Sequence, residues 1–488
     1  MQYHSTREPE VYVSASQAIH QGLSPEGGLF VPAAFPQIQW QDYAGLSYPQ
    51  LAAEILKLFL TDYPEDFLKE ATAQAYGEAF QGRAGQMTEV APGLYSLELW
   101  HGPTSAFKDY ALQLMPRLLV QAKRNLGCEE QTLILVATSG DTGKAALAGY
   151  QDIPGVQIAV FYPNCGTSEI QRLQMCTQEG GNVAVYAVQG NFDDAQTGVK
   201  RVFGDKAVSE ELESRGVQLS SANSINWGRL APQIVYYFSA YLQLVDKGAV
   251  KAGDPVDFCV PTGNFGDILA GYYAKRMGLP VGRLLCASNK NDVLTEFLTT
   301  GKYNANREFY RTSSPSMDIL VSSNLERLLY HVAGCSEDVE EWMRDLAKEG
   351  EYTVPDEILA EIQQDFAAGS ADDVEAAAEL RNRYEHDGYL CDTHTAVAFR
   401  VAREYAAQHE SAAPMVVLST ASPYKFPRDV LAALGQPVPD DEFEAMHQLE
   451  ALSGIAAPRA LSTLREKEER FTQVIEPVEI ADVALGTK

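Results

Sequence analysis

The feature that most constrains the fold is a unit that occurs twice: a short apolar run, a glycine-containing loop and a helical stretch. The first unit begins at residues 132–137 and continues into a helical pattern over 144–150. The second begins at 256–260 and continues into a helix predicted over 267–277. A wholly apolar strand is typical of a sheet that is covered on both faces. The two units therefore predict an α/β fold with a mostly parallel sheet.

Further apolar runs at 156–161, 183–188 and 415–418 bring the prediction to at least five parallel-type strands. We place them in two doubly wound domains, a smaller one over residues 96–250 and a larger one over 251–488. The chain has 488 residues, of which 45% are hydrophobic, and this length is more than a single core usually needs.

Two segments differ from this pattern. Residues 1–95 combine a turn-rich start with a helical stretch over 48–61, and we expect a separate N-terminal lobe. Between about 291 and 388 the chain is acidic and helical in pattern, for example over 356–368. A helical insertion with a solvated charged face explains that composition.

The charge balance limits the partners of the chain. With 38 basic and 66 acidic residues the formal charge is -28, which argues against a nucleic acid or an anionic membrane surface. Seven cysteines without a C-x-x-C pair favour reduced thiols over disulfides or a metal site. The start of the chain has no apolar targeting region, and no stretch reaches the roughly 18 apolar residues of a membrane span. We therefore expect a cytoplasmic protein that takes a small-molecule ligand.

Lys108, in the run His-Gly-Pro-Thr-Ser-Ala-Phe-Lys-Asp over residues 101–109, is the first candidate for chemistry. A lysine that acts as a Schiff-base nucleophile must be partly neutral, and apolar neighbours such as Ala106 and Phe107 favour the neutral amine. Taken alone, a lysine beside an aspartate is more often a solvated surface pair. His101 and His394 are expected to be structural hydrogen-bonding residues, because no ligand set at metal spacing accompanies them.

Both glycine loops precede a predicted helix, so each presents free N–H groups and a positive helix end to an anion. One loop contains Gly263, Asn264, Phe265, Gly266 and Asp267. Its glycines permit close approach to a phosphate, although an ordinary βα turn capped by the aspartate has the same pattern.

The other loop contains Ser139, Asp141 and Thr142. It differs from a nucleotide P-loop, because two residues rather than four separate its glycines and alanine follows its lysine. Its hydroxyls and backbone amides suit a carboxylate instead. A third segment, residues 223–229, brings Asn223, Ser224 and Arg229 together, a combination that suits a second phosphate.

The ordered set of these segments resembles the threonine synthase family, in its long microbial and fungal form. The resemblance includes the lysine run, residues 22–29 and 139–143, and the segments 190–194, 223–229, 263–267, 314–318 and 419–423. It implies a fold type II pyridoxal-phosphate enzyme that converts O-phospho-L-homoserine and water to L-threonine and phosphate. As a partner we expect that small molecule, with the chain acting as a monomer or a homodimer.

The resemblance also implies roles for particular residues. Lys108 would hold pyridoxal 5'-phosphate as a Schiff base and then move protons among the substrate carbons. The loop residues Gly263, Asn264, Phe265, Gly266 and Asp267 would bind the cofactor phosphate. Asp141 would face the ring hydroxyl and Thr420 the pyridine nitrogen. The substrate carboxylate would be bound by Ser139 and Thr142, and the substrate phosphate by Asn223, Ser224 and Arg229.

One segment departs from the family pattern, because Ser422 and Tyr424 stand where we expect histidine and alanine. This departure bears on the expected role of the neighbouring Thr420. Two alternatives stay open from the sequence. An amino-acid dehydratase or a β-replacement synthase of the same fold would use the same lysine and phosphate loop. A catalytically silent phosphate- or nucleotide-binding protein would use the same sheet scaffold.

Overall fold

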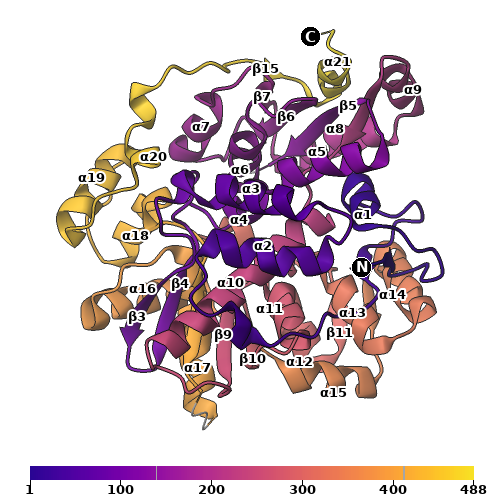
Figure 1. Cartoon of the computed structure of the whole chain (residues 1–488). Helices are drawn as coiled ribbons and strands as arrows, with labels where there is room; N and C mark the ends of the chain where they lie inside the picture. The colour runs from indigo at the N-terminus through magenta and orange to yellow at the C-terminus, as the bar shows by residue number, and fades with distance from the viewer. Residues whose placement is uncertain (139, 410–412, 488) are drawn as a thin grey trace.

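The computed structural model describes residues 1–138, 140–409 and 413–487 (Figure 1). Within these residues, two mainly parallel sheets organise the chain. The six-stranded sheet has the order β13-β10-β9-β14-β4-β3, and the five-stranded sheet has the order β15-β7-β6-β5-β8. Non-consecutive neighbours in both sheets require helical crossovers, and these produce the α/β architecture that the apolar runs predict.

All strand pairs of the five-stranded sheet are parallel. Its strands are β5 (Gln131–Ala137), β6 (Val156–Pro163), β7 (Val183–Val188), β8 (Val217–Ser220) and β15 (Val474–Ile475). In the six-stranded sheet, β3 pairs antiparallel with β4 and the other pairs are parallel. Its strands are β3 (Gln86–Ala91), β4 (Leu94–Glu98), β9 (Val256–Pro261), β10 (Val281–Ser288), β13 (Phe366–Ser370) and β14 (Met415–Ser419).

Alternate residues of the central strands pack into different cores, as expected for strands covered on both faces. In β5, Ile134 and Val136 pack with α6 (Asp141–Tyr150), whereas Leu133 and Leu135 pack with α8 (Phe192–Gly204). In β9, Phe258 and Val260 share a core with α11 (Gly266–Arg276), whereas Cys259 packs with α17 (Thr393–Gln408). Both sheets are therefore doubly wound.

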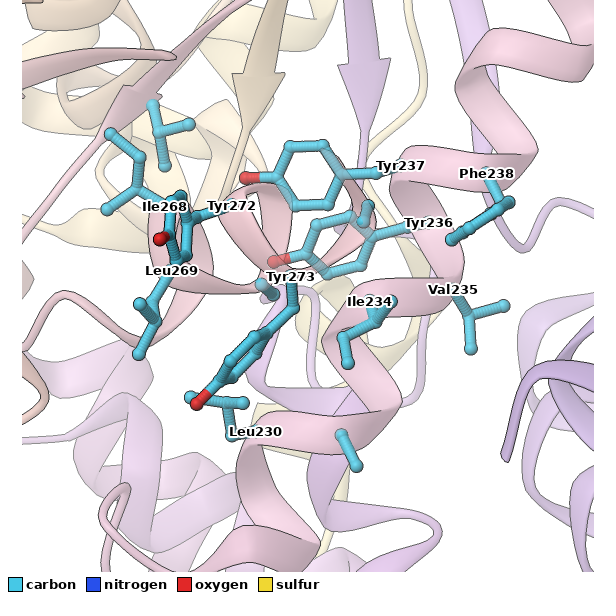
Figure 2. Packing of buried hydrophobic residues seen from close by; sticks show 14 of the residues in the cluster. Leu230, Ile234, Val235, Tyr236, Tyr237, Phe238, Ile268, Leu269, Tyr272 and Tyr273 are labelled. Carbon is cyan, nitrogen blue, oxygen red and sulfur yellow. The ribbon is translucent and has the colours of Figure 1, made fainter. Parts of the chain in front are cut away.

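Helix α10 (Trp227–Asp246) forms the centre of the largest core together with α11. Its side chains are buried along most of its length, and Figure 2 shows Tyr236 and Tyr237 beside the Tyr272 and Tyr273 rings of α11. The Tyr237 hydroxyl donates a hydrogen bond of 2.7 Å to the carbonyl of Asp267. This packing fixes the start of α11 against α10, and so fixes the loop that leads into α11.

The remaining helices surround these layers. They are α1 (Ala15–Gln21), α2 (Tyr48–Phe59), α3 (Glu65–Tyr76), α4 (Lys108–Leu112), α5 (Met115–Leu126), α7 (Glu169–Cys176), α9 (Lys206–Ser214), α12 (Val293–Thr300), α13 (Leu325–Ala333), α14 (Ser336–Glu349), α15 (Asp356–Asp365), α16 (Asp373–Asp387), α18 (Pro427–Ala433), α19 (Glu442–Ser453), α20 (Arg459–Ser462) and α21 (Ile480–Ala484). Two short antiparallel pairs complete the fold: β1 (Tyr3–Ser5) with β2 (Phe30–Pro32), and β11 (Lys302–Asn304) with β12 (Glu351–Thr353).

The predicted helix over 356–368 is wrong at its end. Helix α15 ends at Asp365, and Phe366–Ser370 forms strand β13, which pairs in parallel with β10. The buried Phe366 and the backbone partners offered by the sheet edge outweigh the helical tendency of the alanines. The segment 291–388 is mainly helical, but it also supplies this strand to the six-stranded sheet.

The domain boundaries at 95 and 250 stay a proposal. Strand β3 precedes residue 95 and β4 contains it, and both belong to the six-stranded sheet, while β15, near the C-terminus, joins the five-stranded sheet. Figure 1 shows the C-terminal segment returning to that sheet. In the described part of the chain, no helix combines the length and apolar character needed to span a bilayer.

Candidate functional site

The candidate site lies where the carboxyl ends of three neighbouring strands meet. Strands β9, β14 and β4 are adjacent and parallel, so the loops after them emerge at one edge of the sheet. Those loops carry the 263–267 segment, Thr420 and Lys108. A hydrogen bond of 2.8 Å from the Phe107 N–H to the Thr420 carbonyl joins two of them. The expected cofactor residues of these three loops are thus brought together.

Lys108 begins helix α4, and its side chain is 12% exposed. Its Nζ donates a hydrogen bond of 3.2 Å to the Ser316 hydroxyl and lies 3.9 Å from Asp141 Oδ2. Burial lowers the pKa of Lys108, and the positive charges of Lys425 and Arg229 lower it further, whereas Asp141 raises it. The surroundings thus favour a partly neutral amine, the form that reacts with a carbonyl.

Asp141 begins helix α6 and is nearly inaccessible to solvent. Lys425 Nζ lies 2.5 Å from Oδ1, and the Gln171 side-chain amide donates a 3.0 Å hydrogen bond to the same oxygen. Although burial alone raises the pKa of a carboxyl, Lys425, Lys108 and these hydrogen bonds hold the pKa of Asp141 well below its usual range. Asp141 is therefore a carboxylate at every physiological pH.

Ser316, which contacts Lys108, is held by a buried histidine. The Ser316 N–H donates to His394 Nε2 at 3.1 Å, which leaves Nδ1 of His394 as the donor to Asp392 Oδ1 at 2.8 Å. The imidazole is therefore neutral, with its proton on Nδ1. As expected from the sequence, His394 and His101 make structural hydrogen bonds, the latter with Glu98 Oε2 at 2.6 Å.

The loop 263–267 has the shape of an anion cradle. Phe265 is completely buried at φ 64, a left-handed conformation, and directly precedes α11. The first N–H groups of this helix have no acceptor within it. A Cβ atom on Gly263 would lie 2.8 Å from the Ser316 carbonyl oxygen, so only glycine fits without a shift. These features fit the phosphate of pyridoxal phosphate.

Asp267, in the first turn of α11, has a different electrostatic character from Asp141. Its Oδ1 accepts a hydrogen bond of 2.9 Å from the Ile268 N–H. Burial raises the pKa of Asp267 to about 6, because the nearby Lys108 offsets the loss of hydration only in part. The carboxyl therefore adds little negative charge beside the cradle at mildly acidic pH.

Three further residues are expected ligands: Ser139, Thr142 and Thr420. Thr142 is half-buried in the first turn of α6, and Ser139 lies outside the described residues. Thr138 Oγ1 accepts hydrogen bonds of 3.0 Å from the Gly140 and Gly143 N–H groups and so holds the start of α6. Thr420 is buried after β14.

Arg229 is a buried cation in the first turn of α10. One Nη donates to the Ala222 carbonyl, and within the described residues the Nε has no hydrogen-bond partner. Burial lowers the pKa of Arg229 to about 10. A buried guanidinium with a free N–H is the donor that an anionic ligand would satisfy. Asn223 is exposed and Ser224 half-buried in the loop just before it.

Four residues near the site were not predicted to act there: Ser316, Asn324, Arg327 and Lys425. Asn324 Nδ2 donates to the carbonyls of Asn264 at 3.0 Å and Ser224 at 3.3 Å, which joins the two loops expected to bind phosphates. Arg327 is fully buried and donates to the Asn324 side chain and, at 2.6 Å, to the Ile225 carbonyl. Ser316 and Lys425 stand inside or beside segments that carry the family resemblance, which was the one available signal for them.

Comparison with known families assigns the chain along most of its length. The family described as "Threonine synthase N terminus" matches residues 2–76, and "Threonine synthase, C-terminal" matches 395–483. Between them, "Pyridoxal-phosphate dependent enzyme" matches 86–357.

Individual relatives agree with these matches. Threonine synthase of Pseudomonas aeruginosa is 39% identical, with 99% of this chain and 97% of the relative covered. Human threonine synthase-like 1 is 40% identical over 86% of this chain, and the match spans 58% of the human protein's length. The crystal structure of a pyridoxal-phosphate-bound threonine synthase from Brucella melitensis superimposes with a TM-score of 0.89, at 37% identity and with 100% and 99% coverage. These findings confirm the expected fold class and cofactor.

Proposed function

The chain belongs to the threonine synthase family of pyridoxal-phosphate enzymes, and on that premise we propose that it converts O-phospho-L-homoserine and water to L-threonine and phosphate. The observation that carries the substrate assignment is Arg229, a buried guanidinium whose Nε has no hydrogen-bond partner within the described residues and whose charge lowers the pKa of Lys108. A dehydratase acting on serine or threonine has no substrate phosphate for such a group to bind.

Pyridoxal phosphate, when bound, supplies an electron sink that stabilises negative charge at the substrate α-carbon. The chain's own residues bind it and move protons. In our proposal Lys108 carries the cofactor, and its neutral amine then accepts and returns protons at the α-, β- and γ-carbons of the substrate. Ser316, through its hydrogen bond to Nζ, orients this amine.

The cofactor would be held by residues of three loops. The backbone N–H groups of Gly263, Asn264, Phe265, Gly266 and Asp267 bind its phosphate, with the positive end of α11 adding to the attraction. Asp141 would face the ring hydroxyl, and Thr420 would face the ring nitrogen. A threonine hydroxyl does not hold a full positive charge on that nitrogen as a carboxylate would, so the ring is a weaker electron sink.

The substrate would lie between the two sheets' loops. Ser139 and Thr142 bind its carboxylate at the start of α6, and Asn223, Ser224 and Arg229 bind its phosphate. Loss of phosphate from the γ-carbon places charge on the leaving group, and a desolvated guanidinium stabilises that charge more strongly than water does. Water then adds at the β-carbon to give threonine.

The assay that tests this proposal offers the purified protein O-phospho-L-homoserine, L-serine and L-threonine separately. We expect equal amounts of phosphate and threonine from the first and no ammonia from the other two. Ammonia release from serine or threonine, without phosphate release from the first, would instead identify a dehydratase. The monomer or homodimer state and the cytoplasmic location stay predictions, to be tested by light scattering and cell fractionation.

A further inference from the structure

Lys425 is a buried lysine for which the proposed reaction has no use so far. Its side chain is 0% exposed, and its Nζ lies 2.5 Å from Asp141 Oδ1 and donates a 3.2 Å hydrogen bond to the Thr104 carbonyl. The side-chain nitrogens of two lysines, Lys425 and Lys108, thus face the one carboxylate of Asp141, at 2.5 Å and 3.9 Å respectively. Burying a second cation beside a Schiff-base lysine costs free energy, so the presence of Lys425 at this position requires an explanation.

The turn that carries Lys425 is firmly anchored. The Ser422 N–H donates to the Ser105 carbonyl at 3.1 Å, and the Ser422 hydroxyl accepts from the Tyr424 N–H at 3.3 Å. The Tyr424 hydroxyl contacts the Ile455 carbonyl and lies 2.9 Å from the Ser453 hydroxyl. These contacts hold the backbone of the turn and so limit where the Lys425 side chain can reach.

The charges around Lys108 explain what Lys425 accomplishes. Asp141 and Asp267 favour the ammonium form of Lys108, whereas Lys425 and Arg229 disfavour it. Without Lys425, the carboxylate of Asp141 would be left with Lys108 as its one lysine partner, and a buried carboxylate stabilises a nearby ammonium strongly. With Lys425 in place the carboxylate is already paired.

We propose that Lys425 is a positioning residue that neutralises Asp141 and thereby keeps the Lys108 amine in its uncharged, reactive form. The inference rests on the proposed role of Lys108 and adds an electrostatic partner to it. In this proposal Lys425 acts through Asp141, which its Nζ contacts directly.

The experiment titrates the visible absorbance band of the cofactor-loaded protein against pH for the wild type, Lys425→Met, Asp141→Asn and the double variant. Removing Lys425 should raise the pH midpoint of the absorbance change by about one unit, because a positive charge near Lys108 is lost. Removing Asp141 should lower that midpoint by a similar amount, because a negative charge is lost. The double variant should return close to the wild type. Lys123→Met is the matched control, because Lys123 is a buried lysine bonded to Thr132 at the opposite end of β5, and its midpoint should not move.

An unchanged or lowered midpoint in Lys425→Met would overturn the inference. If that variant does not fold, as judged by circular dichroism, Asp141→Asn alone decides: a fall in the midpoint supports the inference and a rise or no change contradicts it. A second readout is the pH profile of Lys108 acylation in the full chain without cofactor, measured by peptide mass spectrometry. A wild-type protein that stays colourless with pyridoxal phosphate contradicts the proposed function, whereas the acylation profiles still test the inference on its own.

Discussion

The two strand-loop-helix units of the chain share one backbone plan but shift the pKa values of their first-turn carboxyl groups in opposite directions. At the start of α6, Asp141 is paired with Lys425 and Lys108, and its pKa is held low. At the start of α11, burial raises the pKa of Asp267 to about 6, and the charge of Lys108 lowers it only in part. The same pattern of apolar run, glycine loop and helix thus carries one carboxyl with a lowered pKa and one with a raised pKa.

The difference shows what the backbone and the side chains each determine at the site. The backbone plan positions both helix starts at the site. Two side chains that arrive from elsewhere, Lys425 from after β14 and Lys108 from after β4, lower the pKa of the carboxyl at the start of α6. The following predictions change one side of this comparison at a time.

Lys108→Ala removes the amine that faces both carboxyl groups, and it should have the largest effect. We expect turnover of O-phospho-L-homoserine to fall by at least about a thousandfold, because the proton shuttle is lost. Steady-state phosphate release measures it. Lys123→Ala, in α5 and bonded to Thr132 at the far end of β5, should keep nearly full activity, and wild-type rates in Lys108→Ala would contradict its role.

Asp267→Asn tests the electrostatic contrast through stability. Because the folded pKa of Asp267 is raised, its contribution to the free energy of unfolding is fully present below about pH 4 and is lost as pH rises through 6. The stability of the wild type relative to the variant should fall by about 3 kcal/mol over that range, as measured by urea denaturation.

Asp141→Asn should show the opposite sign. The folded pKa of Asp141 is lowered, so its stabilising contribution is present above about pH 4 and is lost as pH falls below that value. Urea denaturation of both variants and the wild type at several pH values compares the two helix starts directly. If the free energy of unfolding relative to the wild type changed with pH in the same direction for both variants, the distinction between Asp141 and Asp267 would be contradicted.

Arg229→Met keeps much of the side-chain volume and removes the charge. We expect KM for O-phospho-L-homoserine to rise and kcat/KM to fall by about 30-fold, as for the loss of a hydrogen bond to a charged group. Arg215→Met, which removes an exposed arginine paired with Glu211, is the control and should leave both constants unchanged. An unaltered kcat/KM in Arg229→Met would remove the support for the phosphate assignment.

Gly263→Ala should have the smallest effect. The new Cβ would lie 2.8 Å from the Ser316 carbonyl oxygen, so the cradle must shift. We expect the affinity for pyridoxal phosphate to fall by about tenfold, in line with the cost of overpacking a tight site. Fluorescence titration of the cofactor-free chain measures it. Gly204→Ala, where the Cβ meets no atom within 4 Å, should not change the affinity.

Much of the fold was predictable, because it depends on local sequence. The apolar runs that became β5 and β9 and the glycine loops after them required only strand and helix-start rules. The end of α15 was not predictable, since Phe366–Ser370 becomes a strand only because β10 offers it an edge. Local propensity favours a helix there, and the sheet overrides it.

The residues of the candidate site also fall into those that the sequence could locate and those that it could not. The loop containing Asp267 and the Lys108 run could be located from their spacing and their resemblance. Lys425 and Asn324 could not, because each acts through a partner far away in sequence, Asp141 and Asn264 respectively. Contacts of that kind depend on the packing of the whole chain.

Borohydride reduction of the protein loaded with pyridoxal phosphate, followed by peptide mass spectrometry, tests the central claim most directly. Three lysines with restricted access to solvent, Lys108, Lys144 and Lys425, lie at or near the start of α6, so the position of the modified residue is informative. We predict the reduced cofactor on Lys108 alone, with loss of the visible band. Modification of Lys144 or Lys425 instead, or no modification, would contradict the account.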